Sequence, residues 1–393
     1  MSLGHSDRAH AFLGASSAKQ WLNCTPSMKA SSHIPSTTST FAEEGTFAHE
    51  LSELFFAREF QNMHGRTFNA KYKKMKENEY YSTELEDYVK EYVDYVAERI
   101  NVAKARDEAT LILLFEERLD LSDYVPESFG TGDVIVSSGG KLEIIDLKFG
   151  KGVEVSAIDN PQLRLYGLGA VELVGLLQDI DEVTMTIHQP RLNNISSESM
   201  ALDDLVKWGT EYVKPRAEMA FKGEGEYVPG EHCRFCKIKA KCRARADANL
   251  KAVADMKDPN LMSDEEISDL LFKVDDIQKW AKDVQTYALY QAQDGKEFEG
   301  WKLVAGRSTR KITDPDEAKD IFSVLFDEDQ FMKPRELKSI TNLEKKIGKK
   351  KVAELIGDLI IKPEGKATLV PESDKRPALN DPASEFAEIK EDK

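Results

Sequence analysis

Four cysteines are the residues of this sequence whose spacing points most directly to metal chemistry. Cys233, Cys236 and Cys242 follow one another at C-x2-C and C-x5-C spacing, and Cys24 stands alone near the N-terminus. Thiolates held this close along a chain can converge on one soft metal centre. Isolated cysteines are more often small buried apolar residues, an interpretation that fits three clustered thiols poorly. The spacing therefore favours a metal or cluster site.

A second chemical pattern is a pair of carboxylates and a lysine on a predicted hairpin. Gly139-Gly140 is typical of a two-residue turn, because both positions can adopt positive φ. Such a turn would place Asp133 directly opposite Asp146, with Cβ atoms roughly 5 Å apart, and Lys148 on the same face. Unpaired carboxylates this close repel each other, and a bound divalent cation is the usual remedy. The alternative is an ordinary surface salt bridge between the lysine and an acid.

Three more polar side chains lie on helices predicted before and after this hairpin. His49 belongs to a helix marked by apolar residues at three- and four-residue steps. A lone histidine in that position is more often a satisfied core or surface residue than a ligand. Gln162 and Tyr166, four residues apart, share one face of the helix that follows the Lys148 strand. Each signal is weak when taken alone.

Together and in this order, these elements resemble the RecB-like branch of the PD-(D/E)XK nuclease superfamily. The cysteine arrangement resembles the iron–sulfur-stapled members of that branch, the AddB-type recombination nucleases and the CRISPR adaptation nucleases. The resemblance covers roughly residues 15 to 245, and it is compatible with a phage or mobile-element protein. It departs from the family at Cys24-Thr25-Pro26, where Pro usually follows Cys directly. The matching motifs are Gly45-Thr46-Phe47-Ala48-His49, Gly132-Asp133, Ile145-Asp146-Leu147-Lys148 and Gln162-Leu163-Arg164-Leu165-Tyr166.

The resemblance implies a Mg²⁺- or Mn²⁺-dependent nuclease, with an exonuclease favoured, that hydrolyses phosphodiester bonds in DNA recombination or processing. It implies that Lys148 orients or helps to deprotonate the attacking water, while Gln162 and Tyr166 position the scissile strand. The implied metal ligands are His49, Asp133, Asp146 and the carbonyl of Leu147.

The same resemblance implies a [4Fe–4S] cluster held by the four cysteines Cys24, Cys233, Cys236 and Cys242. The cluster would tie the N-terminal segment to the end of the domain, and its role would be structural. Structural Zn²⁺ is the alternative, since four cysteines also suit a tetrahedral zinc site. His232, beside Cys233, keeps a mixed zinc site open.

Three basic segments are candidate nucleic-acid contacts on an acidic chain. The net charge of −16 excludes a uniformly basic nucleic-acid coat protein but leaves room for a local basic groove. Residues 71–76 and residues 345–351 are interpreted as solvated surface, with phosphate or protein contacts as the alternative. The segment around the cysteines is interpreted equally as a solvated helix or as a phosphate-tracking patch. Its basic residues are Arg234, Lys237, Lys239, Lys241, Arg243 and Arg245.

The elements that must position these residues alternate between helices and strands, which predicts an α/β fold. The element order predicts a mixed central sheet flanked by helices, and the family resemblance implies that this core is restriction-endonuclease-like. Thr83 is the predicted N-cap of the second helix. Helices are predicted over 17–22, 41–60, 83–102, 160–177 and 202–221, and strands over 111–121, 133–137, 142–147 and 182–188.

With 393 residues the chain can hold two or three domains. We predict a nuclease domain over 1–250 and a smaller helical or α+β module over 251–370. This module would contain helices over 264–293 and 341–359 and a strand over 300–310; a disordered tail would follow over 371–393. The sequence shows no membrane-length apolar run and no secretory signal. These features predict a cytoplasmic protein. The family resemblance implies that its partners are DNA with single strands or free ends, and recombination or phage proteins.

Two other classes of function compete with the nuclease. One is a non-catalytic DNA-end or junction binder that retains the nuclease fold. The presence of His49, Asp133, Asp146 and Lys148 argues against this class, since a catalytically dead scaffold need not keep all four side-chain types. The other is a metal-stapled interaction protein in which the hairpin carboxylates would be accidental.

Overall fold

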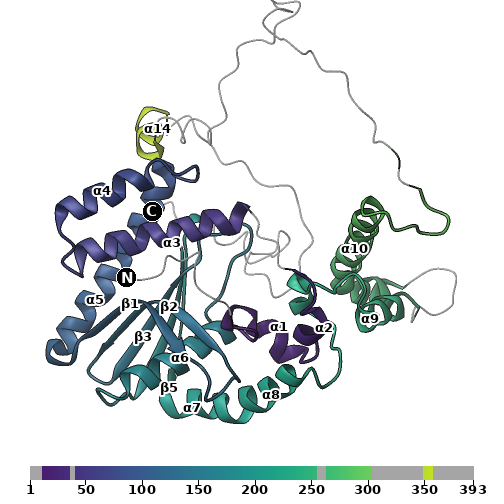
Figure 1. Ribbon diagram of the computed structural model, residues 1–393, viewed down its shortest axis with the longest axis horizontal. Helices are drawn as coiled ribbons and strands as arrows, with labels where there is room; N and C mark the ends of the chain where they lie inside the picture. The colour runs from purple at the N-terminus through teal and green to yellow at the C-terminus, as the bar shows by residue number, and fades with distance from the viewer. Residues whose placement is uncertain (1–10, 36–39, 255–262, 303, 305–347, 357–393) are drawn as a thin grey trace, which may run out of the picture. The chain divides into compact units, whose positions relative to one another are not determined.

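The computed structural model describes residues 11–35, 40–254, 263–302, 304 and 348–356 (Figure 1). The chain forms two compact units. The first comprises residues 1–263 and 275–287, and the second comprises 264–274 and 288–393. The helix α10 (Asp264–Gln293) contributes residues to both units. All the cysteines and all the predicted catalytic and metal-binding residues belong to the first unit.

A five-stranded mixed sheet forms the centre of the first unit, with the strand order β1-β2-β3-β4-β5. Neighbouring strands are antiparallel except β3 and β4, which are parallel. A parallel pair needs a crossover, and α6 (Pro161–Val174) supplies it. The predicted α/β class, a mixed sheet flanked by helices, is confirmed at this level. The strands are β1 (Ile112–Asp120), β2 (Phe129–Ser138), β3 (Lys141–Leu147), β4 (Glu182–Gln189) and β5 (Asn194–Ala201).

The predicted β2–β3 hairpin forms with the expected register. Gly139 and Gly140 have φ values of 53° and 75°, the left-handed backbone that a tight two-residue turn requires. Ser138 pairs with Lys141, and the ladder runs on to the pair Val134↔Ile145. The next residues along the two strands are Asp133 and Asp146. The turn chemistry therefore brings these acids to neighbouring positions on the two strands.

Two long helices cover one face of the sheet: α3 (Thr40–Glu59) and α5 (Thr83–Asp107). Between them and the sheet lies an apolar cluster that we call the α5-side core. The short helix α4 (Gly65–Met75) packs on α3 (Figure 1), and Tyr72 and Met75 border this core. The buried members of the core are Phe47, Ala48, Leu51, Phe56, Leu85, Val89, Tyr92, Val93, Val96, Ile100, Ala103, Val134, Val136, Ile145, Leu147 and Phe149.

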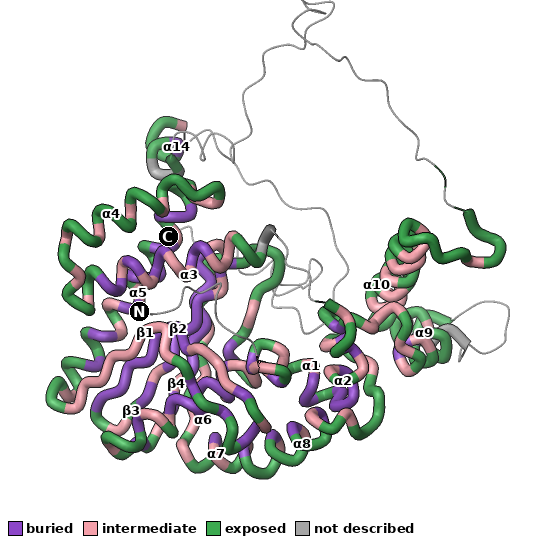
Figure 2. Tube along the Cα trace, in the orientation of Figure 1, coloured by how far each residue is buried: buried purple, intermediate pink, exposed green. Residues whose placement is uncertain are grey.

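The helices α1 (Ala18–Asn23), α6, α7 (Leu202–Lys207) and α8 (Lys214–Lys222) cover the opposite face, and α2 (Ser27–Ser31) packs beside α8. Residues from these helices and from the sheet form the α6-side core, which includes Trp21, Leu119, Leu163 and Val183. Figure 2 shows that buried residues concentrate in the strands and in the helix faces turned toward them. Single-turn segments link these elements: η2 (Ala15–Ser17), η3 (Glu108–Thr110), η4 (Pro190–Leu192) and η6 (Glu231–Phe235).

Three local features differ from the sequence prediction. Ser82, not Thr83, is the N-cap of α5, because its side chain accepts a hydrogen bond from Leu85 N–H at 3.1 Å. The continuous helix predicted over 202–221 is interrupted by a π-helical turn, η5 (Trp208–Val213), just before Pro215, which has no N–H to donate. The polar strand β5 was missed because its sequence, NISSESMA, lacks clear apolar alternation; only one side of this edge strand packs on the core.

The second unit and the end of the first are described in part. The helix α9 (Arg243–Ala254) belongs to the first unit and α14 (Lys349–Ile356) to the second. No side chain of α10 is buried. The strand predicted over 300–310 is described only at 300–302 and 304, which are not strand; the rest, like the tail over 371–393, lies outside the described residues. Within the described part of the chain, no helix is long and apolar enough to cross a membrane.

Candidate metal centre and active site

Ionisable side chains from four elements meet where β1, β2 and β3 lie under α3. His49 Nδ1 lies 3.4 Å from Asp133 Oδ2 and 3.9 Å from Glu116 Oε1. Within the described residues, His49, Glu116 and Asp133 are the one group of three potential ligands whose ligand atoms all lie within 4.8 Å of one another. Lys148 Nζ forms an ion pair with Asp146 Oδ2 at 2.8 Å. The structure thus brings together all four ionisable residues that the sequence singled out, and it adds Glu116.

The helix α3 carries His49 into this group because its apolar side chains fix the rotation of the helix. Phe47 and Leu51, on either side of His49 in the sequence, are buried in the α5-side core. The His49 side chain is 17% exposed, so it lies at the edge of the core rather than inside it. Packing of the neighbouring apolar residues therefore sets the position of His49, and its imidazole ring faces the carboxylates.

Glu116 is the site residue that sequence reasoning missed. Leu114 and Leu119 both pack on the α6-side core, although residues five apart face opposite sides of a regular strand. The alternation switches at Glu116, whose φ of 52° is left-handed and rare for a residue other than glycine. The sequence signal available was the acidic pair Glu116-Glu117 inside a predicted apolar strand. The pattern could not say which acid faces the site, because the switch in alternation is not encoded in the periodicity.

Burial and mutual charge act in opposite directions on the two hairpin acids. Burial by itself would raise the pKa of Asp133, but His49, Lys148 and the Leu147 N–H, which donates to Oδ2 at 2.8 Å, bring it below its usual value. The pKa of Asp146 is raised, because burial and the charge of Asp133 outweigh the attraction of Lys148. One acid is therefore fully satisfied as an anion, while the other is destabilised in its charged form.

The two bases of the site are protonated in the chain as it stands. Burial acts to lower the pKa of His49, but the charges of Asp133 and Glu116 outweigh it and raise the pKa to about 10. Burial also acts to lower the pKa of Lys148, and the charges of Asp146 and Tyr166 reverse this and raise it. The His49 imidazolium and the Lys148 ammonium thus neutralise part of the negative charge of the three neighbouring carboxylates.

The predicted pair on α6 lies beside Lys148 and Asp146. Asn160 caps α6 by accepting hydrogen bonds from Gln162 N–H and Leu163 N–H, with Pro161 at the first helical position. Gln162 Nε2 donates to the Tyr166 hydroxyl at 3.1 Å. Burial first, and then the negative charge of Asp146, raises the pKa of Tyr166 to about 12, which keeps the hydroxyl protonated.

A glycine on β2 makes room for this tyrosine. A Cβ atom on Gly130 would lie 2.5 Å from Tyr166 Cε1, closer than two carbon atoms can approach. The ring can therefore lie against the strand only where the strand has no side chain. This close approach is what sets the tyrosine next to the hairpin acids.

The four cysteines form a second cluster, built from both ends of the first unit. Cys24 directly follows α1, Cys233 lies in η6, and Cys236 and Cys242 follow it; the first three are buried. All four are free thiols. Burial raises the pKa of Cys236 to about 11, and the other three cysteines contribute to that shift through their charges. The folded chain therefore brings together thiols that are more than two hundred residues apart in the sequence.

A comparison with protein-family models identifies the group to which this fold and this pair of clusters belong. The model described as "Protein of unknown function (DUF2800)" matches residues 10–377, nearly the whole chain. The chain belongs to the DUF2800 family. The match spans both compact units and includes every candidate site residue.

Two solved structures are similar to this DUF2800 protein over part of its length. One is described as a "Putative exonuclease" from Eubacterium rectale, with 13% identity, a TM-score of 0.30, and coverage of 57% of this chain and 86% of the other. The second is a protein called SSO0001, with 13% identity, a TM-score of 0.21, and coverage of 58% and 96%.

The basic segment around the cysteines is largely occupied by contacts within the DUF2800 protein. Arg245 is 2% exposed and pairs with Asp276 and Asp283 of α10 at 3.2 and 2.8 Å. Lys239 pairs with the same Asp283 at 3.0 Å, and Lys241 lies over a tyrosine ring of α10. Lys237 donates to the carbonyl of Ile34. Arg245 is thus unavailable to a phosphate, while Arg234 and Arg243 remain exposed.

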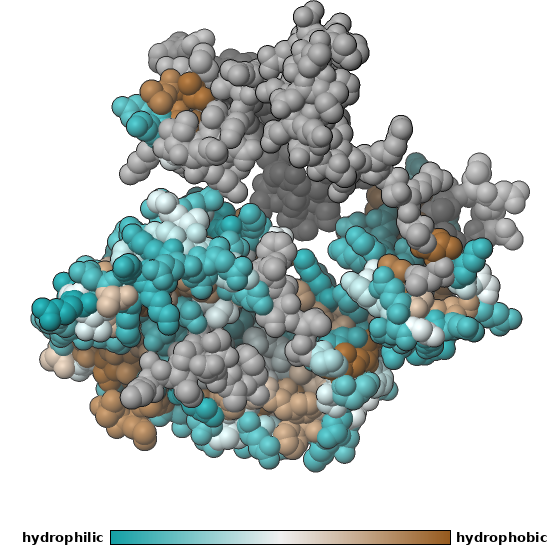
Figure 3. All heavy atoms as spheres, turned by 45° about the horizontal axis from the view of Figure 1, so that its top comes forward, coloured by the Kyte–Doolittle hydropathy of each residue, from teal (hydrophilic) through white to brown (hydrophobic). Residues whose placement is uncertain are grey.

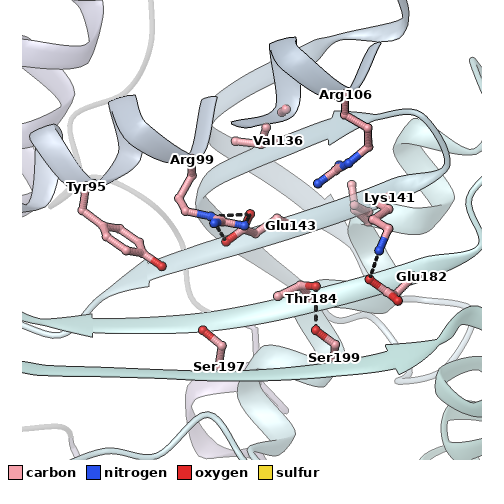
Figure 4. A pocket seen from close by; sticks show the side chains of 12 residues that line it. Tyr95, Arg99, Arg106, Val136, Lys141, Glu143, Glu182, Thr184, Ser197 and Ser199 are labelled. Carbon is pink, nitrogen blue, oxygen red and sulfur yellow. Dashed lines mark hydrogen bonds and ion pairs between the residues drawn. The ribbon is translucent and has the colours of Figure 1, made fainter. Parts of the chain in front are cut away.

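A cavity of about 300 Å³ lies on the α5 side of the DUF2800 protein's sheet (Figure 4), and its lining residues include none of the candidate metal ligands. Its charged lining is mostly paired: Arg99 with Glu143 at 3.0 Å and Lys141 with Glu182 at 2.8 Å. The hydroxyl groups of Thr184 and Ser199 are 2.8 Å apart and hydrogen-bond to each other. The first pair joins α5 to the sheet and the other two join neighbouring strands, which indicates a structural role for these side chains.

Proposed function

We propose that this chain is a divalent-metal-dependent DNA nuclease, an exonuclease with a site of the RecB-like PD-(D/E)XK type, acting in DNA recombination or processing. The observation that carries the proposal is the close approach of His49, Glu116 and Asp133 beside the Asp146–Lys148 ion pair. Five ionisable side chains from α3, β1, β2 and β3 converge there, an arrangement that costs desolvation free energy without adding to the apolar core.

The donor set suits Mg²⁺ or Mn²⁺. Carboxylate oxygens are the preferred ligands of these cations, and an imidazole nitrogen is acceptable to Mn²⁺. Three acids stand against two bases that are protonated without metal, and a divalent cation would replace the proton of His49, whose imidazole binds metal only when neutral. His49, Glu116, Asp133 and Asp146 would hold the ion, with the Leu147 carbonyl as a further ligand. When bound, the cation would stabilise the negative charge that develops on the phosphate and acidify a water molecule.

Lys148 would orient the attacking water, and Gln162 and Tyr166 of α6 would position the substrate. Held by Asp146, the Lys148 ammonium can donate hydrogen bonds to a phosphate oxygen and orient the attacking water. Its side chain is 27% exposed, so a substrate can reach it. Gln162 fixes the Tyr166 hydroxyl, and this pair would position the strand to be cut.

For the thiol cluster we propose a [4Fe–4S] centre held by Cys24, Cys233, Cys236 and Cys242. A single tetrahedral Zn²⁺ with 2.3 Å bonds would draw the sulfurs to about 3.8 Å from one another. A cluster places iron and sulfide atoms between the thiolates and would hold the sulfurs farther apart, so metal analysis distinguishes the two centres.

The decisive experiment incubates the full chain with end-labelled linear single- and double-stranded DNA in Mn²⁺, in Mg²⁺ and in EDTA. We expect cleavage only with a divalent cation, and we expect Lys148→Ala to abolish it while DNA binding persists. Lys151→Ala, an exposed lysine three residues away, is the matched control and should cut normally. Wild-type protein that binds DNA but never cuts would favour the non-catalytic end binder instead.

The thiol centre has its own test. Protein purified without oxygen should be brown with broad visible absorbance, and should contain about four iron atoms per chain. Colourless protein with one zinc per chain would refute the cluster while leaving the nuclease proposal intact.

A further inference from the structure

The short helix α4 is the most basic element that the structure describes, and its charges have no internal partners. From Phe60 to Lys76 the sequence contains no acid, and the protein as a whole carries a net charge of −16. Among the described residues, no ion pair involves any cation of α4 or the lysine that follows it. These cations are Arg66, Lys71, Lys73, Lys74 and Lys76. Only Lys76 makes a further contact, over the rings of Tyr72 and Tyr81.

The apolar face of α4 packs against the rest of the protein, so the opposite face of the helix points outward. Phe68, Tyr72 and Met75 recur at four- and three-residue steps and form the apolar stripe. The rings of Phe68 and Tyr72 pack against Phe55 of α3, with centroid distances of 6.1 and 5.9 Å. The Tyr72 hydroxyl also donates to Glu86 of α5 at 2.6 Å. The helix is therefore anchored on two sides rather than loosely attached.

The opposite face of α4 carries Arg66, Lys73 and Lys74. At 100° per residue these positions lie within about 100° of one another and point away from the apolar stripe. All three side chains are exposed. The view in Figure 3, which brings the α4 side of the molecule forward, shows a largely hydrophilic surface there. We call this set the α4 cationic face.

The α4 cationic face belongs to the same helix pair as the candidate metal ligand His49. Phe55 of α3 contacts the middle of α4, and Tyr80, just after α4, donates to Glu43 in the first turn of α3 at 2.6 Å. These two contacts are twelve residues apart on α3, about 18 Å at 1.5 Å per residue, and His49 is midway between them. The chain from α4 to Tyr80 thus contacts α3 on both sides of His49 along the helix axis.

We propose that the α4 cationic face binds the phosphate backbone of the DNA strand that enters the active site. This inference rests on the proposed nuclease function and names the surface that would deliver its substrate. A polyanion is the partner that matches several exposed unpaired cations on an otherwise acidic protein, and the binding would not depend on sequence. The α4 cations differ in this respect from Arg245 in the basic segment near the cysteines, which forms ion pairs with two aspartates.

The test measures binding separately from cleavage. Full-length Lys148→Ala protein serves as the non-cleaving parent, and fluorescence anisotropy follows its binding to a labelled 30-nucleotide single strand. The variant Arg66→Ala/Lys73→Ala/Lys74→Ala should bind roughly tenfold more weakly or worse. Its slope of log Kd against log salt should fall by about 2, since each lost phosphate contact to a single strand removes about 0.7.

Two further variants exclude a general effect of charge or folding. Lys207→Ala/Lys214→Ala/Lys222→Ala removes three exposed cations from α7 and α8, on the other side of the sheet, and should leave the affinity unchanged. Arg66→Lys/Lys73→Arg/Lys74→Arg keeps the charges and should bind like the parent. Circular dichroism checks that each variant is folded.

The proposal is overturned if the α4 triple variant binds with the parent's affinity and salt slope, if the control triple loses as much, or if the parent does not bind DNA. If the parent binds anionic lipid vesicles but not DNA, the α4 cationic face binds membranes, and the proposal is also overturned. Wild-type protein that binds through α4 but does not cut would refute the nuclease proposal alone. Cutting that is unaffected by loss of α4 charge would refute this inference alone.

Discussion

The two polar clusters of the first unit are held in opposite ways. The carboxylate centre is built on three hydrogen-bonded strands and two packed helices, so its side chains are placed by the fold whether or not a cation is present. The thiol centre joins the end of α1 to a single turn, η6, and to loop residues more than two hundred positions later. That region consists of short helical turns and loops. The comparison predicts that the fold positions the carboxylate centre without a cation, whereas the metal proposed for the thiol centre would stabilise the fold.

The sharpest way to test this difference is to remove charge from the carboxylate centre without removing volume. Asp133→Asn should lower the DNA cleavage rate by about a thousandfold or more, because the residue faces both His49 and the proposed cation. The melting temperature should fall only slightly, since the lost attraction to His49 and Lys148 is partly offset by weaker repulsion with Asp146. Asp123→Asn, an exposed acid in the β1–β2 connection, is the control. Activity retained in Asp133→Asn would remove the carboxylate centre from the mechanism.

The thiol centre should respond in the reverse way. Cys236→Ser should release the metal and lower the free energy of unfolding by about 3–5 kcal/mol, by analogy with a cross-link that closes a long loop. We expect a lower melting temperature and faster proteolysis between α1 and α3. At low temperature the folded fraction should still cut DNA. Loss of the metal with no change in melting temperature would show that the region is held by packing alone, and would break the comparison.

The sequence predicted well the helices and strands that carry the carboxylate centre, because each is determined by residues that are close together in the sequence. The Gly139-Gly140 turn dictates the β2–β3 register, and Asn160-Pro161 dictates where α6 begins. Period-3.6 apolar residues predicted α3 closely enough to place His49 on it. Each of these depends on residues a few positions apart, where turn and capping chemistry are decisive.

The rest of the site depends on contacts between distant segments, which periodicity does not record. Glu116 itself has a left-handed backbone conformation inside a strand, which the apolar pattern of the sequence does not predict. Arg245 looked like a free cation because its aspartate partners on α10 lie thirty or more residues away. The basic residues over 71–76 are interpreted from the sequence as solvated surface and are exposed, but the sequence does not reveal that the apolar face of the same helix packs on α3.

Replacing Glu116 would sharpen the description of the carboxylate centre. Glu116→Gln keeps the size of the side chain and removes its charge, so the Kd for Mn²⁺, measured by isothermal titration calorimetry, should rise about 10- to 100-fold. Glu117→Gln, the adjacent acid outside the cluster, should leave the Kd unchanged. Equal effects in both variants would mean that the left-handed residue does not select the ligand.

The smallest effect concerns a buried histidine in the sheet that supports the carboxylate centre. His188 of β4 lies against Tyr92 and Tyr95, with ring centroids 5.5 and 4.9 Å away, and burial lowers its pKa to about 4. The unfolded chain takes up a proton as the pH falls through about 6.5, whereas the folded chain does not until about pH 4. The free energy of unfolding should therefore decrease across this window, by on the order of 1 kcal/mol between pH 6.5 and 5.5.

His188→Phe should remove this dependence, because phenylalanine fills the site between the two tyrosines and cannot be protonated. Urea denaturation at pH 7.5, 6.5 and 5.5 measures the effect, and the exposed His33→Phe variant should keep the parent's pH profile. Mn²⁺ affinity at pH 7.5 should not change in His188→Phe. If His188→Phe lowers both the free energy of unfolding and the affinity for Mn²⁺, the packing around His188 must also help to position the metal ligands. The sheet and the carboxylate centre would then be energetically coupled.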